Sequence, residues 1–320
     1  MIERLDTFMA RANALYYATR DPFADFTTAP EISQVFGELL GLWAAVVWQS
    51  MGSPAHVLLV EAGPGRGTLM VDALRAIRRM TPDFAAALRL HLVENSPSLR
   101  AVQASKLDAI WHDRLEDVPD GPMILLANEF LDALPIRQFV RRAKWCERYV
   151  EAGRFIERET DEALPDAPEG SVLERCETAL ALARHLGQRL ATQGGAALFL
   201  DYGPEISAFG DSLQALQNRE NSDPLVEAGT ADLTAHVDFQ AFDEAAVGAV
   251  HHGPAPQGMF LARLGLFQRT GVLARTQQPE VAARMMQSAR RLAEPDAMGR
   301  LFKALALCQP DLLQPPGFSE

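Results

Sequence analysis

Short apolar runs alternate with segments of helical periodicity along most of the chain, and this alternation restricts the fold more than any other sequence feature. The runs that would each fill one strand are 57–60, 88–93, 109–111, 123–127 and 196–200. Strands of such composition are buried on both faces, as in a parallel sheet covered by helices. Helices are expected in the gaps, at 31–51, 68–80, 97–106 and 171–193. The sequence therefore predicts an α/β fold built from repeated strand–helix units.

Two regions depart from this alternation. Residues 137–159 alternate with period two around Gly153, which predicts an inserted antiparallel meander. After residue 203 the patterns that indicate helices and strands are weaker. His251 and His252 are expected in a loop. The remaining expected elements are helices at 258–270 and 280–292 and a last strand at 301–307.

The length of 320 residues fits about two units or one large α/β domain with insertions. We expect a single catalytic domain, because the strand–helix pattern resumes after the meander. Its expected parts are an N-terminal helical segment at 1–52, a Rossmann-like core at 53–136 and 196–320, and an insertion at 137–195 that forms the substrate region.

Composition and charge exclude several classes of protein. With 48% hydrophobic and 22% charged residues, the chain is not a disordered one, and its net charge of −12 disfavours nucleic acid as a partner. The longest apolar run, 39–48, is much shorter than the ~20 residues of a membrane helix, so no membrane insertion is expected. The three cysteines form no Cys-x-x-Cys pair, which argues against a disulfide scaffold or a zinc module. Glu3 and Asp6 argue against a targeting leader, and a reducing cytoplasm is the expected compartment.

A glycine-rich turn between a strand and a helix is the sharpest local motif. Gly63, Gly65 and Gly67 follow the first strand, and Thr68 opens the next helix. Glycines accept positive φ and let a ligand approach the main chain, while the helix N-terminus offers unpaired N–H groups. The third glycine comes one residue earlier than in the dinucleotide fingerprint, and Glu61 precedes the first. The motif predicts a nucleotide-type ligand other than a nicotinamide cofactor; the alternative is a tight turn without a ligand.

Acidic residues follow three successive strands, at Glu61, Glu94 and Asp113. The carboxyl ends of parallel strands meet at one sheet edge, where they would form one site. A carboxylate would repel a pyrophosphate but suits an ammonium and a sulfonium group, as in S-adenosylmethionine. We expect Glu94 to accept both ribose hydroxyls and Asp113 to meet the adenine amino group. The alternative is that these acids cap helices.

The fourth strand runs into a polar turn that carries Asn128, Glu129 and Asp132. At that edge these three residues are expected beside the transferable methyl group and are the candidate catalytic residues. Carboxylates could orient a cationic acceptor such as an arginine guanidinium, screen its charge and accept a proton. The alternative is that Asp132 caps a helix and Glu129 pairs with Arg137. His236 and Asp238 are expected to form a structural pair rather than a catalytic or metal site, and no metal is expected.

The chain resembles the MidA-like family of S-adenosylmethionine-dependent methyltransferases. The two most specific matches are Thr-Ala-Pro-Glu-Ile-Ser at 28–33 and Asn-Glu-Phe-Leu-Asp-Ala-Leu-Pro at 128–135. Further matches lie at 16–22, 36–38, 61–68, 201–203, 232–239 and 298–303. The resemblance implies a class I methyltransferase sheet of seven strands with N-terminal helices, and Thr28, Pro30 and Glu31 near the cofactor. One departure is at 22–26, where the chain is shorter and has Ala24 in place of a family glycine.

The resemblance also implies an activity, because mitochondrial members of the family methylate an arginine on a complex I subunit as assembly factors. A bacterial cytoplasmic enzyme with a protein substrate is therefore expected. Two alternatives stay open: another nucleotide-cofactor enzyme on the same fold, and a non-catalytic assembly factor that retains the fold for binding. The oligomeric state is left open, a homodimer included.

Overall fold

The computed structural model describes residues 2–20, 27–218, 220–225 and 228–318. The chain divides into two compact units, each described separately below. The sheet unit consists of Thr28–Phe130, Ala183–Gly203 and Asp243–Glu320. The meander unit consists of Met1–Thr27, Leu131–Leu182 and Pro204–Phe242.

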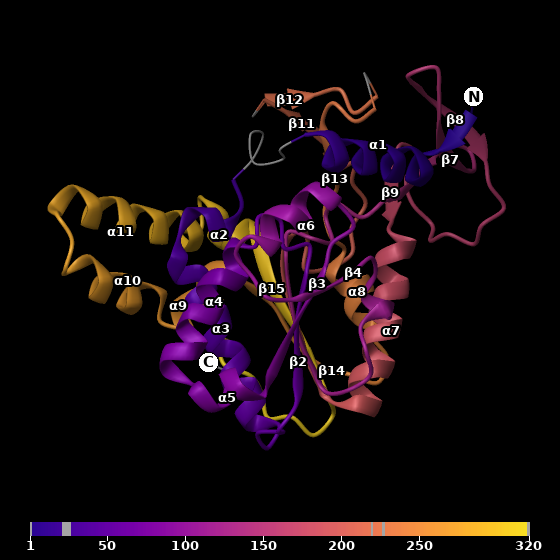
Figure 1. Cartoon of the computed structure of the whole chain (residues 1–320). Helices are drawn as coiled ribbons and strands as arrows, with labels where there is room; N and C mark the ends of the chain where they lie inside the picture. Colours follow the sequence, from indigo (N-terminus) through magenta and orange to yellow (C-terminus); the bar gives the residue numbers. More distant parts are fainter. Residues whose placement is uncertain (1, 21–26, 219, 226–227, 319–320) are drawn as a thin grey trace. The chain divides into compact units, whose positions relative to one another are not determined.

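The sheet unit is built on a seven-stranded sheet (Figure 1). In order across the sheet, the strands are β14 (Val250–Pro256), β15 (Phe302–Cys308), β10 (Gly195–Tyr202), β5 (Met123–Asn128), β2 (Val57–Ala62), β3 (Leu88–Val93) and β4 (Ile110–His112). Neighbours from β10 to β4 are parallel, and β15 pairs antiparallel with both β10 and β14. The predicted α/β fold and all six predicted strands of this sheet are confirmed, with ends moved by at most two residues.

Most of the predicted helices that cover this sheet are found. They are α3 (Gln34–Ser50), α4 (Thr68–Met80), α6 (Pro97–Ala104) and α7 (Glu177–Gln193). The short helix α5 (Pro82–Ala87) and a 3₁₀ turn at Leu115–Asp117 were not predicted. The single helix predicted at 31–51 is wrong, because Ser33 is extended and separates α3 from a short α2 (Ala29–Ile32). The Ser33 side chain accepts a hydrogen bond from the Val35 N–H and so caps α3. The predicted start of the helix at 171 is also wrong, because β9 (Val172–Arg175) precedes α7.

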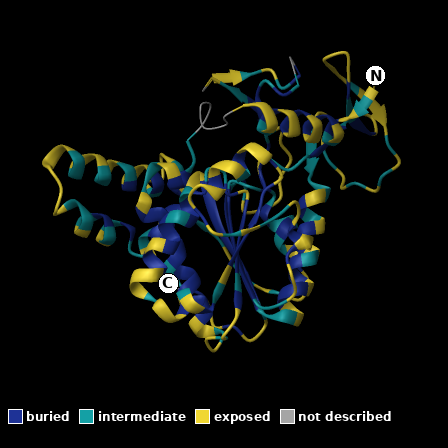
Figure 2. Ribbon diagram, viewed as in Figure 1, coloured by how far each residue is buried: buried dark blue, intermediate teal, exposed yellow. Residues whose placement is uncertain are grey.

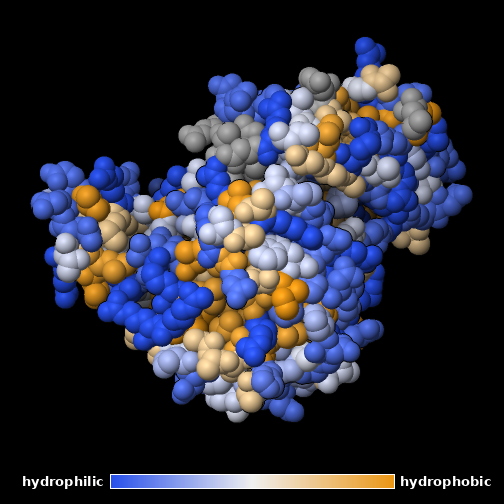
Figure 3. Space-filling view, viewed as in Figure 1, coloured by the Kyte–Doolittle hydropathy of each residue, from blue (hydrophilic) through white to orange (hydrophobic). Residues whose placement is uncertain are grey.

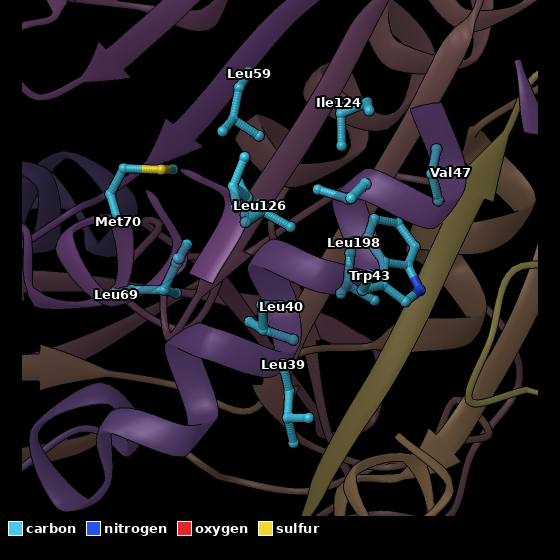
Figure 4. Close-up of a cluster of buried hydrophobic side chains, with 14 of the residues drawn as sticks. Leu39, Leu40, Trp43, Val47, Leu59, Leu69, Met70, Ile124, Leu126 and Leu198 are labelled. Carbon is cyan, nitrogen blue, oxygen red and sulfur yellow. The ribbon is translucent and has the colours of Figure 1, made fainter. Parts of the chain in front are cut away.

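The core of the sheet unit lies between α3 and the central strands. Figure 4 shows Leu40 and Trp43 of α3 near Leu126 of β5 and Leu198 of β10, and Leu39 and Val47 of α3 belong to the same buried cluster. The central strands are buried along most of their length (Figure 2). Burying one such aliphatic or aromatic side chain contributes roughly 1.5–3 kcal/mol. A Cβ at Gly41 would lie 2.7 Å from the Ala73 Cα, so this glycine lets α3 pack closely against α4.

The C-terminal part of the sheet unit adds helices and one unpredicted strand. Its elements include α8 (Phe239–Ala245), which begins in the meander unit, α9 (Gln257–Arg263), α10 (Leu266–Ala274), α11 (Pro279–Ala293) and α12 (Met298–Leu301). The single predicted helix at 258–270 is divided at Gly265, whose φ of +92° ends α9 and begins α10. In Figure 3, hydrophilic residues cover the outer surface of α11, and apolar residues lie between α11 and α10. The prediction of a loop at His251 and His252 is wrong, since both lie in β14, paired with Leu307 and Ala306.

The meander unit contains the antiparallel strands predicted at 137–159. They are β6 (Arg137–Arg141), β7 (Trp145–Glu151) and β8 (Arg154–Glu159), with β1 (Ile2–Arg4) and β9 completing the sheet. A second sheet consists of β11 (Gln214–Gln217), β12 (Glu220–Ser222) and β13 (Asp232–Thr234). Leu5, Phe8, Met9 and Ala12 of α1 (Leu5–Thr19) share a buried cluster with Leu233 of β13. In the described part of the chain, no helix has both the length and the apolar composition needed to span a membrane.

Candidate functional site

The glycine turn has the geometry that its sequence predicts. Gly63, Gly65 and Gly67 have φ values of +65°, +53° and +75°, a region that L side chains rarely adopt. Gly67 directly precedes α4, so the turn leads from the end of β2 to a helix N-terminus. A Cβ at Gly63 would lie 3.0 Å from the Phe130 Cδ2. The first glycine is therefore needed both for its backbone conformation and for its close approach to the end of β5.

Glu61 is a buried carboxyl at the end of β2. The residue is only 3% exposed, and within the described residues its Oε2 has no hydrogen-bond partner. Burial, and then the nearby charge of Glu94, raise the pKa of Glu61 from 4.5 to about 8. Without a ligand this group is therefore mainly protonated at neutral pH. A buried carboxyl of this kind suits a ligand whose positive charge stabilises the ionised form, which can then accept hydrogen bonds from that ligand.

Glu94 follows β3, the strand beside β2. Its Oε1 accepts a hydrogen bond from the Ser96 N–H at 2.8 Å, and its Oε2 lies 3.4 Å from the Gln103 Nε2. Burial is the largest influence on its pKa and raises it, partly offset by these hydrogen bonds. The structure thus brings Glu94 and Glu61 together at neighbouring strand ends, as the sequence predicts.

Asp113 differs from these two acids in its surroundings. It follows β4, but its side chain is 73% exposed and pairs with Arg100 at 2.5 Å. Its carboxylate is therefore already engaged at the surface. The predicted contact of Asp113 with an adenine amino group stays a prediction.

Asn128 and Glu129 form a hydrogen-bonded pair at the end of β5. The Asn128 Nδ2 donates to the Glu129 Oε1 at 2.9 Å, whereas the buried Asn128 Oδ1 has no partner among the described residues. Glu129 has a φ of +51°, which is unusual for a residue other than glycine and is typical of strained functional positions. The same Glu129 Oε1 accepts a hydrogen bond from the Ala29 N–H at 3.0 Å. This carboxylate therefore connects the end of β5 with the start of α2.

The α2 segment is also attached to the N-terminus of α4. The Thr68 Oγ1 donates to the Glu31 Oε1 at 2.5 Å. Thr28 precedes α2 in an extended conformation, and Pro30 lies in its first turn. These contacts place the predicted residues Thr28, Pro30 and Glu31 on a segment held between the glycine turn and Glu129. The departure at 22–26, with Ala24, lies outside the described residues.

Asp201 is a further residue of this region that the sequence reasoning left without a role. It lies in β10, beside β5, and is 1% exposed. Its Oδ2 accepts a hydrogen bond from the Phe130 N–H at 3.1 Å, and its Oδ1 accepts one from the Tyr202 N–H. Asp201 thus fixes the chain directly after Glu129. The signal that could have indicated it is the one used for Glu61: an acid at the end of an apolar strand.

Asp132 belongs to the meander unit, unlike Asn128 and Glu129. It is 7% exposed, and no helix of the described residues begins at it, so the helix-cap alternative is wrong. The Tyr17 hydroxyl donates to the Asp232 Oδ1 at 2.8 Å. Burial, and then the charges of Asp232 and Asp132, raise the pKa of Tyr17 well above 10. Asp132 therefore lies in a buried acidic cluster, and its catalytic role beside Glu129 stays a prediction.

Asp238 has a structural role in the meander unit. Its Oδ1 accepts hydrogen bonds from the Ser207 Oγ at 2.8 Å and from the Ala241 N–H in the first turn of α8. The backbone N–H of His236 donates to the Ser212 Oγ at 2.8 Å. Across the described ranges, no group of three or more His, Cys, Asp or Glu side chains could hold a metal ion.

The residues at the carboxyl edge fit S-adenosylmethionine. Glu61 Oε2 and Asn128 Oδ1 are two buried acceptors that lack partners among the described residues, on the neighbouring strands β2 and β5. A ligand with an ammonium group can supply the missing donors. The glycine turn provides backbone N–H groups, and Glu94 provides an acceptor for hydroxyl groups. These residues would hold the cofactor.

Comparison with known proteins agrees with this chemistry. A family model described as "Putative S-adenosyl-L-methionine-dependent methyltransferase" matches residues 39–255. Protein arginine methyltransferase NDUFAF7 homolog, mitochondrial, from Drosophila melanogaster is 34% identical over 95% of this chain and 80% of its own length. The human protein arginine methyltransferase NDUFAF7, mitochondrial, is 34% identical over 93% of this chain and 77% of its own length.

A solved structure extends the comparison to the fold and the ligand. A superfamily member from Burkholderia thailandensis, crystallised with S-adenosyl-homocysteine, aligns with a TM-score of 0.82 and 26% identity over 99% of this chain and 90% of that chain. S-adenosyl-homocysteine is what remains of S-adenosylmethionine after methyl transfer. The cofactor is therefore S-adenosylmethionine. The chain belongs to the family of S-adenosyl-L-methionine-dependent methyltransferases.

Proposed function

We propose that this methyltransferase modifies an arginine side chain of a protein, and that the acceptor is a subunit of respiratory complex I. The observation that carries the proposal is the pair Asn128 and Glu129 at the end of β5, next to the residues that fit the cofactor. The relatives named as protein arginine methyltransferases cover nearly the whole chain and support the choice of arginine. We expect the enzyme to act in a bacterial cytoplasm.

The cofactor supplies an electrophilic methyl group whose leaving sulfide is neutral, so the protein's own task is positioning and electrostatics. Glu61, Glu94 and the glycine turn would bind and orient the cofactor. The acceptor nitrogen forms a bond to the methyl carbon as the carbon–sulfur bond breaks, and it releases one proton. A guanidinium has a pKa above ~12, so the enzyme must orient its planar fork and favour loss of that proton.

Glu129 is the residue we assign to the acceptor. Its carboxylate is held by the Ala29 N–H and by the Asn128 Nδ2, both on Oε1. These bonds fix the orientation of the group while its negative charge acts on the guanidinium. Asp132 is the second carboxylate that we assign to the acceptor. Each carboxylate could accept the proton released on transfer.

Replacing Glu129 by Gln tests this assignment with little structural change. The carbonyl oxygen of the introduced amide can still accept both hydrogen bonds, whereas the negative charge is lost. We expect methyl transfer to fall by at least about 100-fold, the usual contribution of general acid–base catalysis, with cofactor affinity nearly unchanged. A Glu94→Ala variant should show the opposite pattern, with weaker cofactor binding in a calorimetric titration. Full methyl transfer by Glu129→Gln would contradict the mechanism, whereas intact complex I assembly without methyl transfer would favour a non-catalytic assembly factor.

The acceptor itself is tested by intact mass measurement. Complex I subunits from cells with the wild-type protein should be heavier by one methyl group or a multiple of it than those from cells that carry Glu129→Gln. Peptide mapping should place the added mass on an arginine. Identical masses in both strains would reject complex I as the source of the acceptor.

A further inference from the structure

Gln103 is a fully buried glutamine on α6 whose side-chain amide makes three contacts. Its Nε2 donates to the Gly65 carbonyl oxygen at 2.7 Å and lies 3.4 Å from the Glu94 Oε2. Its Oε1 accepts a hydrogen bond from the Trp111 Nε1 at 2.8 Å. Both N–H groups and the carbonyl oxygen of the amide are therefore used, although the residue is 0% exposed.

The three partners of this amide come from three different segments. Gly65 is the middle glycine of the turn after β2, Glu94 follows β3, and Trp111 lies in β4. The Gln103 side chain also packs against the turn, because a Cβ at Gly67 would lie 3.6 Å from the Gln103 Cγ. One side chain thus connects the glycine turn to the carboxylate that is expected to bind the ribose.

A buried amide with these contacts has a rigid orientation. Leaving any of its polar atoms without a partner would cost the desolvation energy of that atom, so the side chain has little freedom to rotate. Trp111 holds the carbonyl end, and this directs the Nε2 toward Gly65 and Glu94. The direction of the Gly65 peptide and the position of the Glu94 carboxylate are therefore set by the same group.

We propose that Gln103 is a positioning residue for the cofactor, which fixes the Gly65 peptide and the Glu94 carboxylate in the geometry that binds S-adenosylmethionine. The inference depends on the cofactor site and not on the identity of the acceptor. It also accounts for a glutamine at a fully buried position, since neither a carboxylate nor an apolar side chain could donate to two acceptors.

Two variants separate this role from a general contribution to folding. Gln103→Met keeps the length of the side chain and loses all three hydrogen bonds. Gln103→Glu keeps an acceptor for Trp111, loses both donations, and places a second carboxyl beside Glu94. Gln257→Met is the matched control, because Gln257 is also 0% exposed and its side-chain amide donates to the Leu292 carbonyl oxygen of α11.

The readouts are the Kd for S-adenosylmethionine and S-adenosyl-homocysteine by calorimetry, KM and kcat for methyl transfer, and resistance to urea. Loss of a hydrogen bond to a charged group predicts a Kd raised on the order of 10- to 100-fold in both Gln103 variants. The rate at saturating cofactor should stay within a few-fold of wild type, since the contacts of Gln103 are with the cofactor site and not with Glu129. Gln257→Met should lose stability with an unchanged Kd.

The result that overturns the proposal is a folded Gln103→Met or Gln103→Glu protein whose Kd is within about twofold of wild type, that is, within about 0.4 kcal/mol. A Trp111→Phe variant provides a milder test if both substitutions prevent folding. It frees the carbonyl end of the amide and should also raise the Kd; an unchanged Kd for this folded variant would equally reject the role. If the Gln103 variants raise the Kd as expected but no arginine is methylated by the wild-type protein, the result would contradict only the proposed acceptor and not the role of Gln103.

Discussion

Replacing Glu61 by Gln should make the protein more stable and at the same time remove its cofactor binding. The wild-type carboxyl has a pKa of about 8 in the folded protein, compared with an ordinary value of 4.5. Between these two values the folded protein keeps a proton on Glu61 that the unfolded chain has already released. A group whose pKa is raised by folding in this way lowers the free energy of unfolding as pH rises. The amide that replaces the carboxyl does not titrate, so the variant avoids this loss.

The size of the effect follows from the shift. The penalty grows by about 1.4 kcal/mol for each pH unit above 4.5, and it reaches about 3 kcal/mol at pH 7. The penalty reaches its full size above pH 8. It is absent below pH 4.5, where Glu61 is protonated in both the folded and the unfolded protein. From pH 6 to pH 7.5, the stability difference between Glu61→Gln and wild type should therefore widen by about 2 kcal/mol.

Urea unfolding of both proteins at several pH values in this range measures the difference, because the other titrating groups are common to both. Glu169→Gln is the control, since Glu169 lies exposed in a loop. A calorimetric titration with S-adenosylmethionine on the same samples should show that Glu61→Gln binds weakly or not at all. Parallel stability curves for the two proteins between pH 6 and pH 7.5 would refute the reasoning, since they would mean that folding does not hold a proton on Glu61.

Three further predictions concern the same structure. The wild-type Kd for S-adenosylmethionine should fall about tenfold per pH unit up to pH 8 and then level off, because the cation selects ionised Glu61; calorimetry across pH checks this, and a flat profile would contradict it. Gly195→Ala should destabilise the protein by roughly 3 kcal/mol or more in thermal unfolding, because a Cβ there would lie 1.9 Å from the Met123 carbonyl oxygen, whereas Gly210→Ala, with nothing within 4 Å, should have little effect. Asp238→Ala should lose about 1 kcal/mol of stability with the α8 cap but retain methyl transfer in an activity assay; loss of activity in a folded protein would instead favour catalysis.

Local patterns in the sequence were sufficient for six of the seven strands of the sheet and for the glycine turn. A strand buried on both faces must be almost entirely apolar, and a turn with positive φ at three positions strongly favours glycine. Both requirements act over a few residues, so they can be recognised without knowledge of the rest of the chain. The acids at strand ends could be predicted for the same reason, because the carboxyl ends of parallel strands share one edge.

Packing between distant segments decided the features that the sequence did not indicate. His251 and His252 join the sheet because the edge of β15 is available for pairing, although the segment around these two histidines does not form an apolar run. The cap that Ser33 places on α3 is different, because it is a local bond to the N–H two residues further on. For the two histidines, a contact with the surrounding structure overrides the local preference.

The chemistry of the site depends both on the local sequence and on the tertiary structure. The sequence by itself determined which residues stand at the sheet edge: the three glycines of the turn, and the acids after the strands. Only the tertiary structure decided what those residues can do, because burial raises the pKa of Glu61, and hydrogen bonds from the Ala29 and Phe130 N–H groups fix Glu129 and Asp201 across 100 and 71 positions of sequence. The physical reason is that desolvation and hydrogen-bond geometry depend on which segments meet in space, and no local pattern contains that information.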